Sequence, residues 1–272
     1  MKHLAAICLG LFSIAILACE GKNMKESLGE QKAGESASTE IHGLTMDKRF
    51  FFGHQSVGQN IIEGIHLLTT EIPVSRVDTQ KMTDLNIFEK PVIAHAQIGE
   101  NGEPLSKYEE FKILLDSGIG DRVDIAGMKL CYLDISGKTD VQDLFHKYKD
   151  MVVHIKNRHP KLKIIHIATP LTVKSNPVKD LMKKIMGKEN IWREANRNPI
   201  RYNNLLRAEY KNETVFNLDM IEAFGDDSPP FETIDNNYSL DKRFASDWGH
   251  MNDLGKKVVA GKFLRFLENV GK

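Results

Sequence analysis

The sequence contains few cysteines, and this scarcity excludes several classes of protein. There are three, Cys8, Cys19 and Cys131, and the first two lie in or next to an apolar N-terminal run. The remaining chain therefore holds a single cysteine, which excludes an internal disulfide and any cysteine-rich metal site. Stability has to come from a hydrophobic core. Cys131 lies in an apolar stretch, so we expect it to be a buried packing residue.

The sequence also lacks an excess of charge of either sign. Lys and Arg together number 37, as do Asp and Glu. This balance offers no reason to expect a nucleic acid as a partner. With 272 residues, 41% of them hydrophobic, the chain can bury a substantial core in one large or two small domains.

Residues 1–18 have the form of a signal peptide. The apolar run over 4–17 is too short to span a bilayer comfortably as a permanent helix. It ends in the residues I-L-A-C at 16–19, which resemble the lipobox of bacterial lipoproteins. The resemblance implies cleavage before Cys19, lipid attachment to that residue, and, because Glu20 follows, an outer-membrane location in a Gram-negative cell. An ordinary secretory signal that contains a cysteine is the alternative.

Residues 19–45 are rich in Glu, Lys, Gly and Ser and have almost no aromatic or branched side chains. Such a segment cannot bury enough apolar surface to order itself, so we predict a flexible tether. The tether would join the membrane anchor to a globular domain over residues 46–272.

Strand-like and helix-like patterns alternate along residues 46–272. Apolar runs predict strands at 49–52, 91–97, 123–133, 163–168 and 215–218. Periodic patterns predict helices at 57–68, 108–115, 139–157, 177–186, 200–210 and 254–270. Strands separated by helices favour a three-layer α/β/α sandwich with a mainly parallel sheet, flavodoxin-like in class.

The junction between the first predicted strand and the first helix carries a serine, Ser56. Such a turn exposes its residues at the carboxyl edge of the sheet, where open α/β sheets bind ligands. The helix start also offers free N–H groups that suit an anion or a developing oxyanion. Ser56 is therefore a candidate nucleophile if a base lies nearby. The structural alternative is that Ser56 is only a helix N-cap.

A candidate base lies in the residues D-W-G-H at 247–250, just before the last predicted helix. An aspartate such as Asp247 can orient the imidazole of His250 and stabilise its protonated form. The structural alternative makes His250 a surface histidine, with Asp247, Asn252 and Asp253 as helix-capping residues. Together the two junctions indicate a possible triad in the order Ser56, Asp247, His250.

These two blocks resemble those of the SGNH hydrolases, also called the GDSL esterase/lipase superfamily. The residues G-H-Q-S at 53–56 are similar to the first block with one residue more, and residues 247–252 are similar to the last block, including Asn252. The resemblance covers about residues 46–272. It implies ester hydrolysis through Ser56, His250 and Asp247, without a cofactor.

At the third block of that family, this sequence departs from the family pattern. The family pattern Gly-x-Asn-Asp corresponds here to C-Y-L-D at 131–134, where only Asp134 matches. By analogy with the family, the oxyanion donors would be the Ser56 N–H and a glycine N–H from Gly99 or Gly102. Gln55 or Tyr132 could replace the missing asparagine. Otherwise the domain is a catalytically silent surface module that binds a glycan or a partner.

Two further histidines, His54 and His95, fall near the ends of predicted strands. We expect both to line the pocket, whereas His166 falls within a buried strand pattern and is predicted to be structural. A metal site made with Asp247 and His250 is an alternative, but the residues are scattered without a short ligand spacing, so we predict no metal.

The substrate class follows from location and family resemblance together. A lipid-anchored envelope protein of this type would act on an O-acylated glycan or a similar envelope or environmental ester, or would transfer the acyl group to a sugar. The basic segment over 183–201 is either a solvated helix face or a lip that favours an acidic or sugar substrate. Trp248 could stack on a sugar or pack beneath its loop.

Overall fold

The computed structural model describes residues 46–79, 84–174, 195–210, 214–225 and 238–270. The predicted signal segment, the whole predicted tether with Cys19, the predicted helix at 177–186 and most of the basic segment lie outside these residues. Within the described part of the chain, no helix is both long enough and apolar enough to cross a membrane.

The centre of the fold is a six-stranded sheet in which every pair of neighbouring strands is parallel. The strand order is β2-β3-β1-β4-β5-β6. The strands are β1 Arg49–His54, β2 Val74–Arg76, β3 Val92–Gln97, β4 Ile125–Met128, β5 Lys163–Ile167 and β6 Val215–Phe216. After β1 the chain passes to the edge strand β2, returns to β3 beside β1, and then continues on the other side of β1 through β4, β5 and β6. The carboxyl end of β1 is therefore the switch point at which open α/β sheets form ligand sites.

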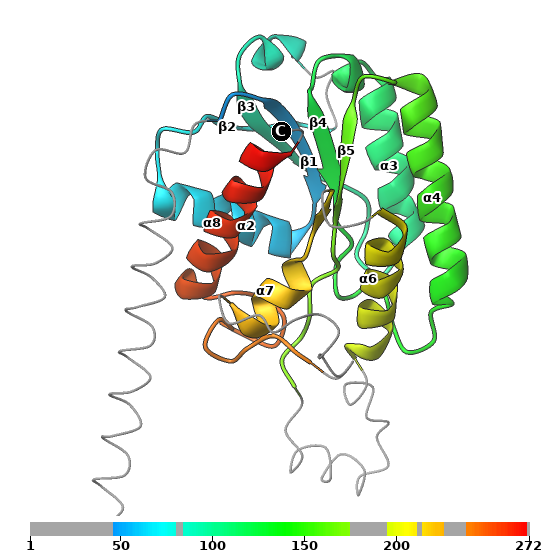
Figure 1. The fold of residues 1–272 in the computed structure, drawn as a ribbon, viewed down its shortest axis with the longest axis vertical. Helices are drawn as coiled ribbons and strands as arrows, with labels where there is room; N and C mark the ends of the chain where they lie inside the picture. Colours follow the sequence, from blue (N-terminus) through cyan, green and yellow to red (C-terminus); the bar gives the residue numbers. More distant parts are fainter. Residues whose placement is uncertain (1–45, 80–83, 175–194, 211–213, 226–237, 271–272) are drawn as a thin grey trace, which may run out of the picture.

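Helices cover both faces of the sheet (Figure 1). One face carries α3 (Pro104–Asp116), α4 (Val141–Arg158) and α6 (Arg197–Tyr210), and the other carries α2 (Ser56–Leu68) and α8 (Asp253–Asn269). Shorter elements complete the described chain: α7 (Leu218–Phe224) and the 3-10 helices η1 (Leu85–Phe88) and η2 (Ile119–Asp121).

Three consecutive phenylalanines of β1 divide between two separate cores, because successive side chains of a strand point to opposite faces. Phe51 stacks on Phe111 of α3 with ring centroids 6.0 Å apart. Phe50 lies edge-on to Phe263 of α8 at 5.7 Å, and Phe52 joins the same cluster. One hydrophobic cluster thus fills each side of the sheet. The predicted three-layer α/β/α fold with a parallel sheet is confirmed.

Two predicted strands are shorter than their apolar patterns. The strand predicted at 123–133 ends at Met128, and the next residues cross the carboxyl edge as a loop in which Leu130 and Cys131 remain buried. The strand predicted at 215–218 ends at Phe216, and Leu218 already begins α7. In both cases buried residues continue past the last residue of the strand, so the apolar pattern predicts a strand end that lies too far along the chain. The short strand β2 was not predicted.

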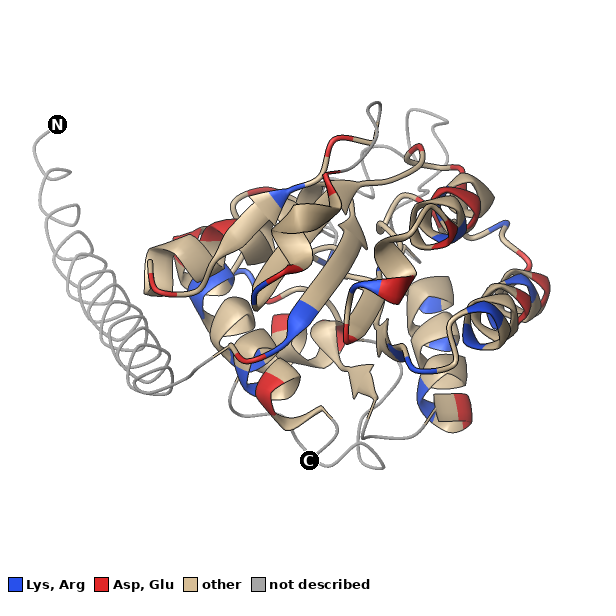
Figure 2. Cartoon of the chain, turned by 90° about the horizontal axis from the view of Figure 1, so that it is seen from above, with Lys and Arg blue, Asp and Glu red and all other residues tan. Residues whose placement is uncertain are grey.

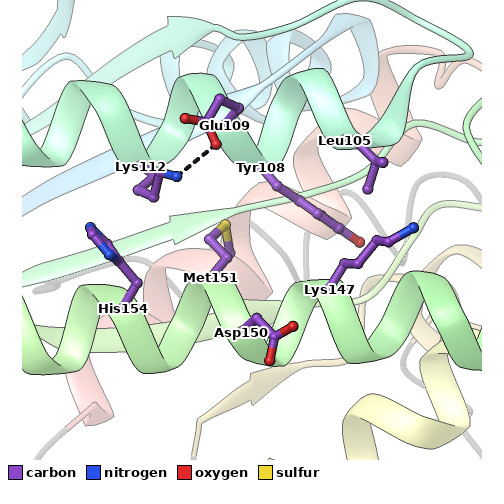
Figure 3. Close-up of a pocket in the computed structure, with 8 residues that line it drawn as sticks. All are labelled: Leu105, Tyr108, Glu109, Lys112, Lys147, Asp150, Met151 and His154. Atoms are coloured by element: carbon purple, nitrogen blue, oxygen red, sulfur yellow. Dashed lines mark ion pairs between the residues drawn. The ribbon is translucent and has the colours of Figure 1, made fainter.

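Lys and Arg residues and Asp and Glu residues are interspersed along the described helices and loops (Figure 2). A groove runs between α3 and α4 (Figure 3), and its walls carry both charged and apolar side chains: Leu105, Tyr108, Glu109, Lys112, Lys147, Asp150, Met151 and His154. None of these residues is a site residue predicted from the sequence. The predicted site lies instead at the carboxyl end of β1.

Candidate active site

The turn from β1 into α2 places Ser56 at the first helical position. Gln55 occupies the N-cap position in an extended conformation and makes no side-chain cap. Its amide instead donates to the carbonyls of Ile98 and Gly99, at 2.8 and 2.7 Å, and so ties the turn to the loop after β3. The N-cap interpretation of Ser56 is therefore wrong, and its hydroxyl is directed elsewhere.

That hydroxyl lies 2.9 Å from Nε2 of His250, across 194 residues of sequence. Nδ1 of the same imidazole lies 2.8 Å from Oδ2 of Asp247. The structure thus brings the three side chains into one line of hydrogen bonds. With a carboxylate as its acceptor, Nδ1 carries the hydrogen, and Nε2 presents its lone pair to the serine. This is the arrangement that a general base needs.

Asp247 is fixed from both sides. Its Oδ1 accepts the backbone N–H groups of Gly249 and His250, each at 2.8 Å, while Oδ2 binds the imidazole. Partial burial alone would raise the pKa of Asp247, but these three hydrogen bonds outweigh it and hold the pKa below its usual value. The carboxylate therefore stays ionised at neutral pH and can stabilise a protonated His250.

Two asparagines hold the loop that carries His250, and only one of them was singled out from the sequence. Oδ1 of Asn60, one turn after Ser56 on α2, accepts the N–H of Met251 at 3.1 Å. Asn252 caps α8 by accepting the Gly255 N–H at 3.0 Å, and its amide donates to the Arg243 carbonyl at 2.7 Å. Asn252, a predicted pocket residue, thus anchors the helix. Asn60 interrupts an otherwise apolar helix face, which is the signal that could have found it.

The predicted oxyanion donors are mostly engaged elsewhere. The Gly99 N–H donates to Oε2 of Glu110 at 2.7 Å, and the Gly102 N–H donates to Oδ1 of Asp134 at 2.9 Å. The Gln55 amide already serves two carbonyls. The Ser56 N–H lies at the start of α2, where helix geometry supplies no acceptor for it. Of the predicted donors, it is the one that the hydrogen-bond pattern of α2 leaves without a helical acceptor.

A buried ion pair that the sequence did not predict lies behind the site. Nζ of Lys107 on α3 lies 2.7 and 2.5 Å from the two carboxylate oxygens of Asp134, and both side chains are fully buried. Asp134 also accepts the N–H groups of Cys131 and Gly102. Asp134 thus connects the loop after β4 to the loop after β3.

His54 and His95 form a buried pair next to the serine. Nδ1 of His54 donates to the carbonyl of Gln55 at 2.7 Å, and Nε2 lies 3.0 Å from Nδ1 of His95. Burial lowers the pKa of His54 to about 3 and that of His95 to about 4, so both are neutral at physiological pH. Gly58 packs directly on His54, because a Cβ there would lie 2.2 Å from the Cβ of that histidine.

Within the described residues, no cluster of three or more His, Cys, Asp or Glu side chains is arranged to hold a metal ion. Cys131 and His166 are both buried, as predicted, and Nδ1 of His166 lies 2.8 Å from the hydroxyl of Tyr148. Trp248 lies edge-on to Tyr132 at 4.9 Å and is 37% exposed, so it forms part of the outer rim of the site.

Comparison with known proteins places the chain among distant structural neighbours only. No protein-family model and no curated protein matches the sequence. Among solved structures, it is similar to a protein from Streptococcus pneumonia described provisionally as a platelet activating factor, with 13% identity over 94% of this chain and 99% of that one and a TM-score of 0.47.

Two further structures are similar at a lower level. One is the periplasmic domain of a lipopolysaccharide acetyltransferase from Salmonella ser. Paratyphi A, with 14% identity over 84% of this chain and 87% of that one and a TM-score of 0.38. The other is a salicylyl-acyltransferase from a tetracycline biosynthetic pathway, with 13% identity over 80% and 54% of the two chains and a TM-score of 0.31. Such similarities concern the fold alone.

Proposed function

We propose that the protein is a serine ester hydrolase of the SGNH type. The observation that supports this is the continuous line of hydrogen bonds from Ser56 through His250 to Asp247, at 2.9 and 2.8 Å. Ser56 attacks the acyl carbonyl while Nε2 of His250 takes the serine proton, and Asp247 stabilises the resulting imidazolium. The alcohol leaves with that proton, and water then clears the acyl-enzyme by the same route.

The oxyanion that forms at the carbonyl is bound by the Ser56 N–H at the start of α2, where the helix dipole also favours negative charge. We further propose an O-acylated glycan or a similar envelope ester as the substrate. This class rests on the lipobox-like residues 16–19 and on the family resemblance, not on the chemistry of the pocket.

The test uses short-chain p-nitrophenyl esters with the wild type, Ser56→Ala and a matched control. The control is Ser117→Ala, which removes an equivalent hydroxyl from the C-terminal end of α3, where it donates to the Leu114 carbonyl. We expect Ser56→Ala to lose at least about 10³-fold in kcat/KM, and Ser117→Ala to keep wild-type activity. A serine-directed fluorophosphonate should also label Ser56, as located by peptide mass spectrometry.

A silent binding module is the second candidate, and one observation favours it. Leu133 stands where the family has its asparagine, and a leucine side chain cannot donate a hydrogen bond to an oxyanion. Absence of turnover on every ester, with binding of acylated glycans retained in Ser56→Ala, would support the module and contradict the hydrolase. Acylated product formed when a sugar acceptor is added would show acyl transfer instead of hydrolysis.

A further inference from the structure

Tyr132 stands beside the proton-carrying nitrogen of the triad. Its hydroxyl lies 3.4 Å from Nε2 of His250, the same atom that Ser56 Oγ contacts at 2.9 Å. The phenol comes from the loop after β4, on the opposite side of β1 from the loop after β3 that holds Gln55. One imidazole nitrogen therefore has two hydroxyl neighbours, from two different elements.

The ring of Tyr132 has a fixed place. It packs edge-on against the imidazole of His250, with centroids 5.7 Å apart and an interplanar angle of 79°, and edge-on against Trp248. Gly249 leaves room for it, since a Cβ at that position would lie 2.5 Å from Cε1 of the ring. The residue is only 9% exposed. Packing of the ring thus holds the hydroxyl next to Nε2 of His250.

The position of the Tyr132 hydroxyl indicates which of the two ester oxygens it can contact. Nε2 first receives the serine proton and then gives it to the alcohol oxygen, so it faces the alcohol side of the tetrahedral intermediate. A hydroxyl beside Nε2 is on that same side. We propose, resting on the hydrolase function above, that Tyr132 donates a hydrogen bond to the alcohol oxygen of the substrate ester.

A change of partner during the reaction makes this donor available. In the resting enzyme, the lone pair of Nε2 can accept from either Ser56 or Tyr132. Once Nε2 has taken the serine proton, it is a donor itself and no longer accepts. The phenol hydrogen then turns to the alcohol oxygen. Burial raises the pKa of Tyr132 to about 12, so the phenol keeps its proton at working pH.

The step balances without any further reactant. The bond between Ser56 Oγ and the acyl carbon has formed, and the bond between that carbon and the alcohol oxygen breaks. The proton on Nε2 passes to the departing oxygen, while Tyr132 retains its own. In deacylation water gives its proton to Nε2 as its oxygen bonds to the acyl carbon, and that proton passes to Ser56 Oγ when the bond between Oγ and the acyl carbon breaks.

This role selects a substrate class, namely esters of weakly acidic alcohols such as sugar and alkyl hydroxyls. An alkoxide concentrates its negative charge on one oxygen, so a second donor lowers the barrier to its departure. A nitrophenolate spreads its charge over the ring and needs little help. The contribution of Tyr132 should therefore depend on the leaving group.

The experiment compares Tyr132→Phe with the wild type on two acetates, p-nitrophenyl acetate and an alkyl acetate, by kcat/KM, which reports acylation. The variant keeps the ring and its packing. We expect the alkyl ester to lose about 10²-fold and the nitrophenyl ester less than about tenfold. Tyr210→Phe is the matched control, since it removes a phenol hydroxyl from α6 outside the triad loops, and should leave both rates unchanged. Thermal melting checks that each variant folds.

Equal losses on the two esters would overturn the inference, because they would assign Tyr132 to the carbonyl oxygen or to positioning of His250. Unchanged rates on both esters would overturn it as well. Ser56→Ala separates these outcomes from failure of the hydrolase proposal itself. If Ser56→Ala retains activity, the hydrolase proposal fails, whereas loss in Ser56→Ala with no leaving-group effect in Tyr132→Phe refutes only the present inference.

Discussion

The buried ion pair between Lys107 and Asp134 gives a stability prediction with a defined magnitude. Both carboxylate oxygens lie within 2.7 Å of the ammonium, and both side chains are 0% exposed. Replacing Lys107 by Met keeps the aliphatic length of the side chain and removes the charge. The carboxylate of Asp134 then stays buried and keeps its hydrogen bonds from the N–H groups of Cys131 and Gly102, but it has lost its ion-pair partner.

Loss of one partner from a buried pair costs about 3–5 kcal/mol, because the remaining charge has no counter-ion in a low-dielectric interior. Since whole domains are stable by about 5–15 kcal/mol, Lys107→Met should lower the free energy of unfolding by a large fraction. Asp134→Asn leaves a buried ammonium and should be comparably harmful. The double variant has no unpaired charge, so it should lose about 1–3 kcal/mol less than the sum of the single losses.

Urea unfolding followed by circular dichroism measures all four proteins. The matched control is Lys147→Met, which breaks an ion pair with Asp143 of the same 2.7 Å length, but with side chains 46% and 58% exposed. It should lose less than about 1 kcal/mol. Additive single losses, or a loss in Lys107→Met no larger than in the control, would refute the reasoning that burial makes this pair costly to break.

Two further predictions concern the triad and acid stability. Asp247→Asn removes the carboxylate that holds the Nδ1 hydrogen of His250, so kcat on p-nitrophenyl acetate should fall by roughly 10⁴-fold. A loss below about tenfold would deny Asp247 this role. Burial lowers the pKa of His54 to about 3 and of His95 to about 4, so the unfolded chain binds more protons below pH 6.5. The contribution of the two neutral histidines to the free energy of unfolding is complete above pH 6.5. It should fall by about 1.4 kcal/mol per pH unit for each histidine as the pH drops from 6.5 towards the pKa of that histidine in the folded protein. The midpoint of urea unfolding, measured at pH 7.5 and at pH 5.5, tests this. An unchanged midpoint would contradict the prediction. His95→Gln should weaken the dependence of the midpoint on pH.

The sequence was sufficient for the fold class and for the two junctions of the site, because both depend on local patterns. A phenylalanine run followed by Gly53 and a helical period locates the turn at Ser56, and D-W-G-H locates His250. Their actual meeting could only be inferred from the rule that carboxyl ends of parallel strands share an edge.

The parts that were missed depend on tertiary context. Lys107 occurs in a helix with an otherwise ordinary charge pattern, so the sequence alone predicts a solvent-exposed lysine. It is buried only because the loop that carries Asp134 packs on it and forms the ion pair. The end of β4 at Met128 was missed because the chain stays buried as it leaves the sheet. Periodicity reports burial, and it does not report whether the buried backbone is still paired in a sheet.

The distance of 194 residues between the two hydrogen-bonded partners Ser56 and His250 has a consequence for biogenesis. During synthesis from the N-terminus, the serine emerges early, while its base follows only with the segment that leads into α8. The proposed reactive centre is therefore incomplete until that helix docks beside α2. Turnover would therefore report completion of the whole domain, and a chain cut before α8 would be inert even if its sheet assembled.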